Sequence, residues 1–343
     1  MKRLRYPIFL IICSGFFLEV IVRAFFTTET SAEESLRNIH MYRPNTEFCY
    51  TGRPRRPIEF NVCSKWNQLG FHGRDIPAEP SKVASPRIMV IGDSFTQAIH
   101  VPDGENFVAI AESIAGGYFY NFGRSGTGPL FGLKSLERYG DTIKPEIVIY
   151  AFYYNDLIDD FVPWKTQQGK ETWSIDKQRF WVPFMLKSYE LAFNGLRRRI
   201  SPPKPWGETP YFTEALTIAT DETLDVAIAW QNHFQNVEKI IDWCETHNAE
   251  FVYLELGHPI LQSHSKALTE AGIENDPHLP ITRMTRHAQI HGYQFIQTSG
   301  KLHGSYTYKY DLHYTRLGHK QVGEILGHAI KMRVKNFQLV ATQ

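Results

Sequence analysis

The stretch Arg87-Ile-Met-Val-Ile-Gly-Asp-Ser-Phe-Thr96 is the most informative part of the chain. A run of apolar and β-branched residues is typical of a buried strand, and this run breaks at Gly92, just before Asp93 and Ser94. The order predicts a strand that ends in a tight turn and presents a serine hydroxyl where a helix begins. A hydrolase exposes a nucleophilic serine in this way, beside donors for an oxyanion. Taken alone, Gly-Asp-Ser fits a phosphate-holding turn or an ordinary helix cap equally well.

Short apolar runs and helical patterns alternate along the rest of the chain. The predicted strands are 88–91, 118–122, 147–152, 251–256 and 293–297, and the predicted helices lie near 105–115, 130–140, 222–247, 280–291 and 315–333. Asp221 is a suitable N-cap for the longest helix. Strands with little polar alternation suit a sheet that is covered on both faces. The alternation therefore predicts an α/β fold of three layers, α/β/α, with a parallel sheet of about five strands and right-handed crossovers.

Composition shifts divide the chain into segments. Residues 27–86 are polar and punctuated by Pro and Gly, which predicts a linker that becomes an ordered lead-in around 67–75. Residues 87–335 form the predicted α/β domain, and 336–343 form a tail. Residues 160–221 interrupt the domain with a stretch rich in Trp, Phe and Pro. Irregular segments of this length inside a domain are usually functional or disordered, and the aromatic content favours an insertion that lies over the carboxyl edge of the sheet.

The amino terminus predicts the compartment. Lys2, Arg3 and Arg5 precede the mostly apolar stretch from Tyr6 to Phe26. A helix of this length is about 30 Å long, enough to cross a bilayer. Residues 1–26 are therefore interpreted as a signal anchor that stays in the membrane, with the rest of the chain outside the cytoplasm. A cleaved secretory signal, which would release the domain, is the alternative.

Two cysteines lie in the polar segment that follows the predicted anchor. Cys49 and Cys63 are fourteen residues apart, and export would place them in an oxidising compartment. A disulfide between them and two unpaired thiols are both compatible with the sequence.

The overall charge and the spacing of ligand-type residues exclude some classes. The chain of 343 residues has 37 basic and 36 acidic side chains, a balance that does not favour nucleic-acid binding. There are 14 histidines, but no His-Glu-x-x-His, Cys-x-x-Cys or similar pattern was identified. The sequence therefore predicts no metal site and no cofactor.

A serine is a poor nucleophile unless a base accepts its proton. The best candidate base is His313, which lies in a predicted loop just before the last helix, two residues after Asp311. A carboxylate at that distance can hold the imidazole in the tautomer that accepts a serine proton. His319 is the nearest competitor, and we expect it to lie in the first turn of the last helix and face away.

Two further fragments supply hydrogen-bond donors. Gly126 belongs to a glycine-rich stretch after the second strand, and Asn155 follows the third strand. The carboxyl ends of neighbouring parallel strands converge, so these residues should face the same small volume as Ser94. The backbone N–H groups of Ser94 and Gly126 and the Asn155 amide would form a three-donor oxyanion hole.

These four fragments together resemble the SGNH (GDSL-type) hydrolase superfamily. Its blocks match Gly92-Asp93-Ser94, Gly126, Asn155 and Asp311/His313, and the resemblance covers roughly residues 60–335, including Asn67-x-x-Gly-Phe-x-Gly73, which is seen in one exported branch. It implies a flavodoxin-like sheet and ester hydrolysis through an acyl-serine, in which Ser94 attacks, His313 is base and then acid, and Asp311 orients His313. One departure from the family pattern is the spacing of the last block, where Asp311-x-His313 replaces the usual Asp-x-x-His.

The expected function is that of an exported serine esterase acting on acyl groups, O-acetyl or short acyl, of a carbohydrate or envelope component. Arg124 and Tyr153 are candidate substrate-binding residues at the rim. The aromatic insertion would stack on sugar rings, although a lipid acyl chain would use the same side chains. An O-acyltransferase with the same Ser-His-Asp site and a catalytically inactive SGNH-like binding or assembly protein are the alternatives.

Overall fold

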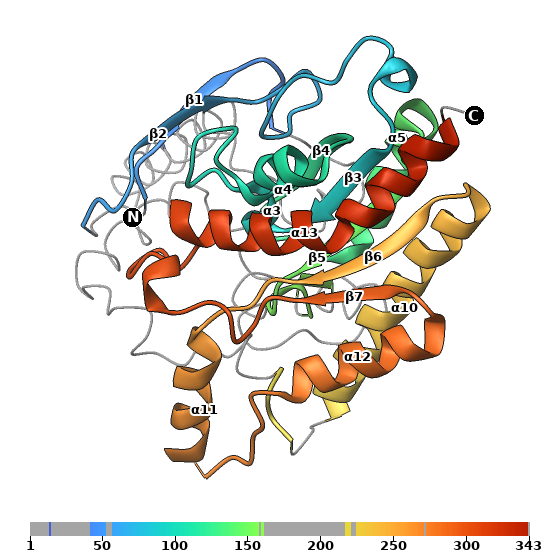
Figure 1. Ribbon diagram of the computed structural model, residues 1–343. Coiled ribbons are helices and arrows are strands. Elements are labelled where there is room, and N and C mark those ends of the chain that lie inside the picture. Colours follow the sequence, from blue (N-terminus) through green and yellow to red (C-terminus); the bar gives the residue numbers. More distant parts are fainter. Residues whose placement is uncertain are drawn as a thin grey trace, which may run out of the picture. The chain divides into compact units, whose positions relative to one another are not determined.

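Five parallel strands form the central sheet of the protein, shown as a computed structural model in Figure 1. The structure describes Ser14 and residues 42–52, 57–157, 159–160, 217–220, 224–270 and 272–341. The strands are β3 (Arg87–Gly92), β4 (Tyr118–Gly123), β5 (Ile147–Phe152), β6 (Glu250–Glu255) and β7 (Gln294–Gln297). Their order in the sheet is β4-β3-β5-β6-β7. By chain order this is the 2-1-3-4-5 arrangement of flavodoxin-like folds, as the sequence predicted.

Helices cover both faces of this sheet (Figure 1). On one face α4 (Phe107–Ala115) packs against α13 (Arg316–Ala341). They approach closely because α13 has glycines where side chains would collide: a Cβ at Gly323 or Gly327 would lie 2.6 or 2.8 Å from the Cβ of Ile110 or Ile114. The other face carries α5 (Pro129–Ile143), α10 (Leu224–Thr246) and α12 (Leu279–His291).

The remaining elements are short or peripheral. The four-residue helix α3 (Ser94–Gln97) follows β3 directly, and α11 (Ile260–Glu270) lies between β6 and α12. Two 3-10 turns lie in loops, η1 (Pro80–Lys82) before β3 and η3 (Gly304–Tyr306) after β7.

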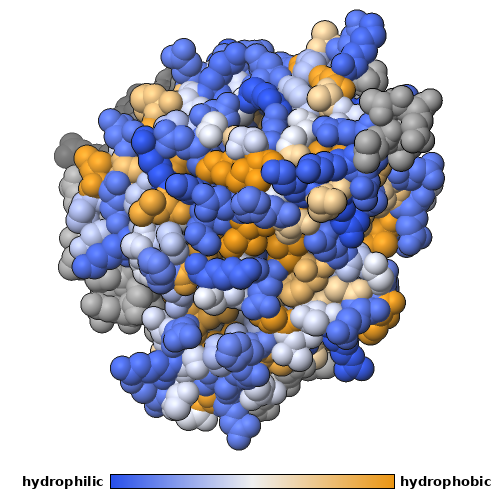
Figure 2. Space-filling view, viewed as in Figure 1, coloured by the Kyte–Doolittle hydropathy of each residue, from blue (hydrophilic) through white to orange (hydrophobic). Residues whose placement is uncertain are grey.

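The core lies where the strands meet both helical layers. All six residues of β5 are buried, as are five of six in β3 and in β6, so these strands show no polar alternation. Such a pattern fits a parallel sheet covered on both faces, as predicted. Figure 2 shows a predominantly hydrophilic surface, with hydrophobic residues visible mainly in the middle of the view, near α13 and β6.

The segment before the sheet is more ordered than its sequence indicates. Strands β1 (Glu47–Tyr50) and β2 (Val62–Lys65) form an antiparallel hairpin, and Cys49 and Cys63 face each other in it and form a disulfide. The prediction of a linker over this part was therefore wrong. Only four residues pair in each strand, so the alternation of Phe48 and Tyr50 with Glu47 and Cys49 is too short to stand out in the sequence.

The ordered lead-in was predicted around 67–75, and its structure explains the motif there. The Asn67 side chain accepts hydrogen bonds from the backbone N–H groups of Leu69 and Phe71, at 2.9 and 3.0 Å. Gly70, between them, has φ +82°, a conformation that favours glycine. The turn delivers the Phe71 ring into the core, where its exposure is zero.

Some sequence predictions need correction, and others lie outside the described residues. Helix α13 continues to Ala341, so a tail beginning at 336 was wrong, and α11 was not predicted at all. The anchor at 1–26 (apart from Ser14), the Asp221 cap and nearly all of the insertion at 160–221 fall outside the described part of the chain. Within that part, no helix has the length and apolar character needed to cross a membrane.

Candidate active site

Ser94 lies where the sequence predicted it, as the first residue of α3, directly after the turn that ends β3. Asp93 is the N-cap of α3, and its side chain accepts a hydrogen bond from the Phe95 N–H at 2.9 Å. The turn is tight because backbone crowds it from the next strand: a Cβ at Gly123 would lie 2.2 Å from the backbone nitrogen of Gln97. Ser94 retains 8% exposure, whereas Asp93 has none.

Ser94, His313 and Asp311 form a continuous hydrogen-bonded chain. The Nε2 of His313 is 2.8 Å from Ser94 Oγ, and its Nδ1 is 2.6 Å from Asp311 Oδ1. Burial alone would raise the pKa of Asp311, but hydrogen bonds from His100 and His313 outweigh it and hold that pKa well below its usual value. Asp311 is therefore ionised and can only accept, which leaves Nε2 of His313 to accept the Ser94 proton.

Asp93 offers the Ser94 hydroxyl a second partner. The distance from Ser94 Oγ to Asp93 Oδ2 is 3.2 Å, longer than the 2.8 Å to His313. Burial raises the pKa of Asp93 to about 6, although the Phe95 N–H and the nearby His313 lower it in part. A serine has only one hydroxyl proton, so His313 Nε2, which lies at the shorter distance, is the better acceptor for it.

His100 is a member of the site that the sequence analysis missed. Its Nε2 lies 3.2 Å from the same Asp311 oxygen that His313 contacts, and its ring stacks on the His313 ring with centroids 3.8 Å apart and planes 15° apart. His100 is 3% exposed. Its position six residues after Ser94, in the loop that leaves the nucleophile turn, was the available signal.

The loop that carries Asp311 and His313 is held from two sides. The Glu59 carboxylate, from the segment between β1 and β2, accepts hydrogen bonds from the backbone N–H groups of Lys309, Tyr310 and Asp311 at 2.6, 2.9 and 2.9 Å. On the other side, His258 Nε2 lies 2.8 Å from the Leu312 carbonyl. Since Ile260 N–H donates to His258 Nδ1, Nε2 carries the proton and donates.

Leu312 accounts for the short Asp-x-His spacing. Its φ is +73°, a left-handed conformation that is uncommon for a residue with a branched side chain. Its N–H donates to the Tyr308 carbonyl, while its own carbonyl accepts a hydrogen bond from His258 Nε2. The turn at Leu312 thus lets residues only two apart point their side chains at one another.

The strand register brings the three proposed oxyanion donors to one edge of the sheet. Gly92 pairs with Gly123 of β4 and Ala151 of β5, so Ser94, Gly126 and Asn155 follow matched positions on three adjacent strands. Gly126 has φ +70° and open space where a side chain would stand. The Asn155 amide donates to Asp159 at 3.0 Å with one of its two hydrogens.

Tyr153 packs differently from the expectation of a residue at the rim of the site. Tyr153 is only 3% exposed, and its ring stacks on Phe95 at 3.9 Å, so it supports the nucleophile turn rather than forming an open rim. Arg124 is half-buried, with its guanidinium 5.1 Å from the Tyr42 ring centre. His319 lies in the first turn of α13, as expected, and burial lowers its pKa well below the usual value.

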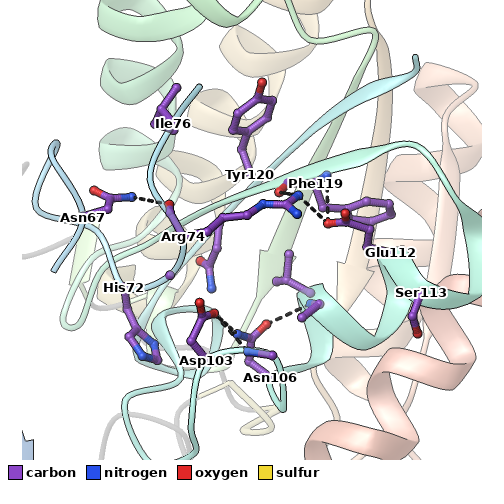
Figure 3. Close-up of a pocket in the computed structure, with 15 residues that line it drawn as sticks. Asn67, His72, Arg74, Ile76, Asp103, Asn106, Glu112, Ser113, Phe119 and Tyr120 are labelled. Carbon is purple, nitrogen blue, oxygen red and sulfur yellow. Dashed lines mark hydrogen bonds and ion pairs between the residues drawn. The ribbon is translucent and has the colours of Figure 1, made fainter. Parts of the chain in front are cut away.

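A pocket of about 390 Å³ lies apart from this chemistry, between the lead-in and α4 (Figure 3). Arg74 reaches across it to Glu112 at 2.6 Å and to the Phe119 carbonyl at 3.0 Å. None of Ser94, Asp311 and His313 lines it. The hydrogen-bonded chain at Ser94, and not this cavity, is therefore the candidate active site.

Comparison with known proteins gives structural similarity only. No family model and no curated protein matches this chain. Similar solved structures include the psychrotrophic esterase EstA from Pseudoalteromonas sp. (10% identity, 73% of this chain, 100% of that chain, TM-score 0.43). The lipase/acylhydrolase from Enterococcus faecalis is 13% identical, and the match covers 72% of this chain and 96% of that chain with a TM-score of 0.41. A GDSL-like lipase from Bacteroides thetaiotaomicron VPI-5482 is 10% identical, and the match covers 77% of this chain and 92% of that chain with a TM-score of 0.38.

Proposed function

We propose that this protein is a serine hydrolase of the SGNH type, which cleaves esters through an acyl-serine intermediate. The observation that carries the proposal is the continuous chain from Ser94 Oγ to His313 Nε2, at 2.8 Å, and from His313 Nδ1 to Asp311, at 2.6 Å. A nucleophile, a base within hydrogen-bond reach and a carboxylate that orients the base are the arrangement that activates a serine hydroxyl.

The first half of the reaction acylates the enzyme. Ser94 Oγ attacks the ester carbonyl carbon as its proton passes to His313 Nε2, and Asp311 stabilises the imidazolium that forms. The N–H groups of Ser94 and Gly126 and the Asn155 amide are the proposed donors to the oxyanion. The tetrahedral intermediate then collapses, and His313 gives the proton to the departing alcohol.

The second half restores the enzyme. His313 takes a proton from a water molecule, whose oxygen attacks the acyl carbon. Collapse of the second intermediate breaks the bond to Ser94 Oγ, and the same proton returns to that oxygen. A free acid leaves, and the site regains its starting protonation.

We also propose a compartment and a class of substrate for this hydrolase. The disulfide between Cys49 and Cys63 suits an oxidising compartment, in agreement with a membrane anchor at 1–26 and a domain outside the cytoplasm. We infer O-acetyl or short acyl esters of a carbohydrate or envelope polymer as substrates, from that location and from the aromatic residues of 160–221. An acylated lipid is the competing substrate.

A labelling experiment tests the catalytic proposal. The full-length protein, purified in detergent, would be treated with a fluorophosphonate probe and assayed on short aryl acetates, beside Ser94→Ala and His313→Ala. We expect stoichiometric labelling of the native protein, none of Ser94→Ala, and a fall in hydrolysis of at least about 10³-fold in both variants. Native protein that is neither labelled nor active above the Ser94→Ala background would make the inactive binding protein the correct description.

The acceptor is tested in the same assay. Sugar acceptors are added together with the aryl acetate, and the products are examined for transferred acetyl groups. Release of acetate alone supports the hydrolase, whereas acetylated sugar formed in preference to acetate identifies an O-acyltransferase that uses the same acyl-serine.

A further inference from the structure

Helices α10 and α12 contact each other through side chains that repeat every fourth residue on both helices. Residues three or four apart lie on one face of a helix, so such a repeat aligns two faces turn by turn. Two successive contacts are aromatic: the Arg283 guanidinium lies 5.1 Å from the Trp230 ring centre, and the Phe234 and His287 rings stack at 4.3 Å with planes 11° apart.

One turn further along, the contact changes from aromatic to ligand-type. The Oε1 atom of Glu238, on α10, lies 3.3 Å from Nε2 of His287 and 3.6 Å from Nε2 of His291, both on α12. The two imidazoles stack with centroids 4.2 Å apart. We propose that Glu238, His287 and His291 form a binding site for a divalent cation of the zinc class, which would join α10 to α12.

The distances suit a tetrahedral ion. Two ligands that each lie about 2.0–2.1 Å from zinc at a tetrahedral angle are separated by about 3.3 Å. The two separations from Glu238 match this value within a few tenths of an ångström, and all three ligand atoms lie within 4.8 Å of one another. Two imidazole nitrogens and one carboxylate oxygen favour Zn²⁺ over Mg²⁺ or Ca²⁺, which prefer oxygen ligands.

The surroundings hold His287 in the orientation that a ligand needs. Its Nδ1 lies 2.7 Å from the Tyr293 hydroxyl, whose oxygen can accept a hydrogen bond from Nδ1–H and so leave the Nε2 lone pair for the ion. The ring is 8% exposed and is stacked on Phe234. Glu238 and His291 have side chains that are 42% and 31% exposed, so an ion can enter from solvent and keep a water as its fourth ligand.

The position separates this site from the catalytic one. His291 ends α12 just before β7 begins, which places the cluster toward the amino edge of the sheet, whereas Ser94 follows the carboxyl end of β3. A second ligand-type group of the described residues, His100, Asp311 and His313, belongs to the candidate active site. The test must therefore distinguish zinc at the two places.

Zinc titration by calorimetry tests the proposal on the full-length protein after chelator treatment. We expect His291→Ala to bind one zinc fewer than the native protein, and Glu238→Gln and Tyr293→Phe to weaken that equivalent about 10- to 100-fold. His247→Ala is the matched control, because this exposed histidine contacts one carboxylate, Asp141, at 3.8 Å. It should bind zinc like the native protein, and Mg²⁺ should not compete.

Two further readouts make the result decisive. Saturating zinc should raise the melting temperature of the native protein and of His247→Ala by about 2 °C or more, and that of His291→Ala by less. Hydrolysis of aryl acetates should be the same in His291→Ala and native protein, because the cluster lies away from Ser94. Equal zinc stoichiometry and affinity in native protein and a folded His291→Ala would overturn the proposal and leave a cluster of ordinary hydrogen bonds.

Discussion

At the scale of single residues, Asp311 differs from the carboxylate of a simple triad because two histidines share it. His100 and His313 both contact its Oδ1, and their rings stack face to face. A carboxylate with two donors is more firmly fixed in the plane of the His313 ring than one with a single donor. We therefore assign His100 a positioning role, in which it acts through Asp311 and through the His313 ring on which it stacks.

Replacing His100 with phenylalanine should separate its two contacts. His100→Phe keeps an aromatic ring against His313 but removes the hydrogen bond to Asp311. A hydrogen bond to a charged group contributes about 1.5–3 kcal/mol, so we expect kcat on aryl acetates to fall about 10-fold or more, with KM little changed. His100→Ala, which loses the ring as well, should fall further. A kcat for His100→Phe equal to that of the native protein would show that Asp311 needs no second donor.

The sequence predicted the residues of the candidate site more completely than the residues that hold them in place. Ser94, His313 and Asp311 were recognisable because each sits in a short local pattern, next to a strand end or a helix start. His100, Glu59 and His258 could not be assigned in this way, because each acts on a loop 50 to 250 residues away. The left-handed turn at Leu312 was equally hidden, since nothing in a leucine signals a positive φ.

Among the elements, the hairpin of β1 and β2 holds the loop that carries Asp311 and His313. The disulfide ties the two strands together, and Glu59 projects from the segment between them onto three successive backbone N–H groups of residues 309–311. Phe60, beside it, packs on His100 and Tyr308 with ring centroids 5.2 and 4.8 Å apart. The hairpin therefore fixes both Asp311 and the second histidine that contacts it.

Removing the Glu59 carboxylate should loosen this loop without unfolding the domain. In Glu59→Ala, three N–H groups lose a charged acceptor, and we expect hydrogen exchange at residues 309–311 to speed up at least about 10-fold, with kcat reduced about 5- to 50-fold. Glu59→Gln retains one acceptor oxygen and should lie between Ala and the native protein. Unchanged exchange at these three amides, in a folded Glu59→Ala, would contradict the assignment.

Elements were predicted well where they are long and buried. The five strands of the sheet and four helices follow the sequence pattern to within a few residues, because burial imposes that pattern, whereas α13 continues eight residues beyond its predicted end. The hairpin escaped prediction because a strand of four residues is too short to show a clear alternation. Helix α11 was simply overlooked, since its buried residues Ile260, Leu261, His264 and Leu268 do recur at helical spacing.

Buried histidines and buried carboxyl groups change the stability of the whole protein in opposite directions as the pH falls. Burial lowers the pKa of six histidines of the described part, namely His72, His233, His258, His264, His287 and His319. Burial also raises the pKa of four acids, namely Asp93, Asp156, Asp160 and Glu255. Acid weakens the fold through the histidines, which take up protons mainly when unfolded, and strengthens it through the carboxyl groups, which take them up while folded.

The two sets offset each other in the native protein, so its own pH dependence does not report on a single group. Comparison of the native protein with a variant that lacks one histidine isolates the contribution of that histidine. Burial lowers the pKa of His233 to about 3, against an ordinary value of 6.5, so this residue contributes stability above about pH 6.5 that is lost as pH falls toward 3. In His233→Gln, the unfolded chain no longer takes up that proton. The slope of the unfolding free energy against pH should then be lower than in the native protein by about 1.4 kcal/mol per pH unit between pH 6 and 4.

Urea unfolding at fixed ionic strength and several pH values measures this difference. The variant will be less stable at pH 7, because the Nε2 of His233 lies 2.8 Å from the Tyr253 hydroxyl in the core, and so the pH slope is the informative quantity rather than the absolute stability. The exposed His247→Gln serves as the matched control and should keep the native slope. Parallel curves for His233→Gln and the native protein between pH 6 and 4 would mean that His233 takes up its proton in the folded state, with water reaching a position that has no exposed surface here.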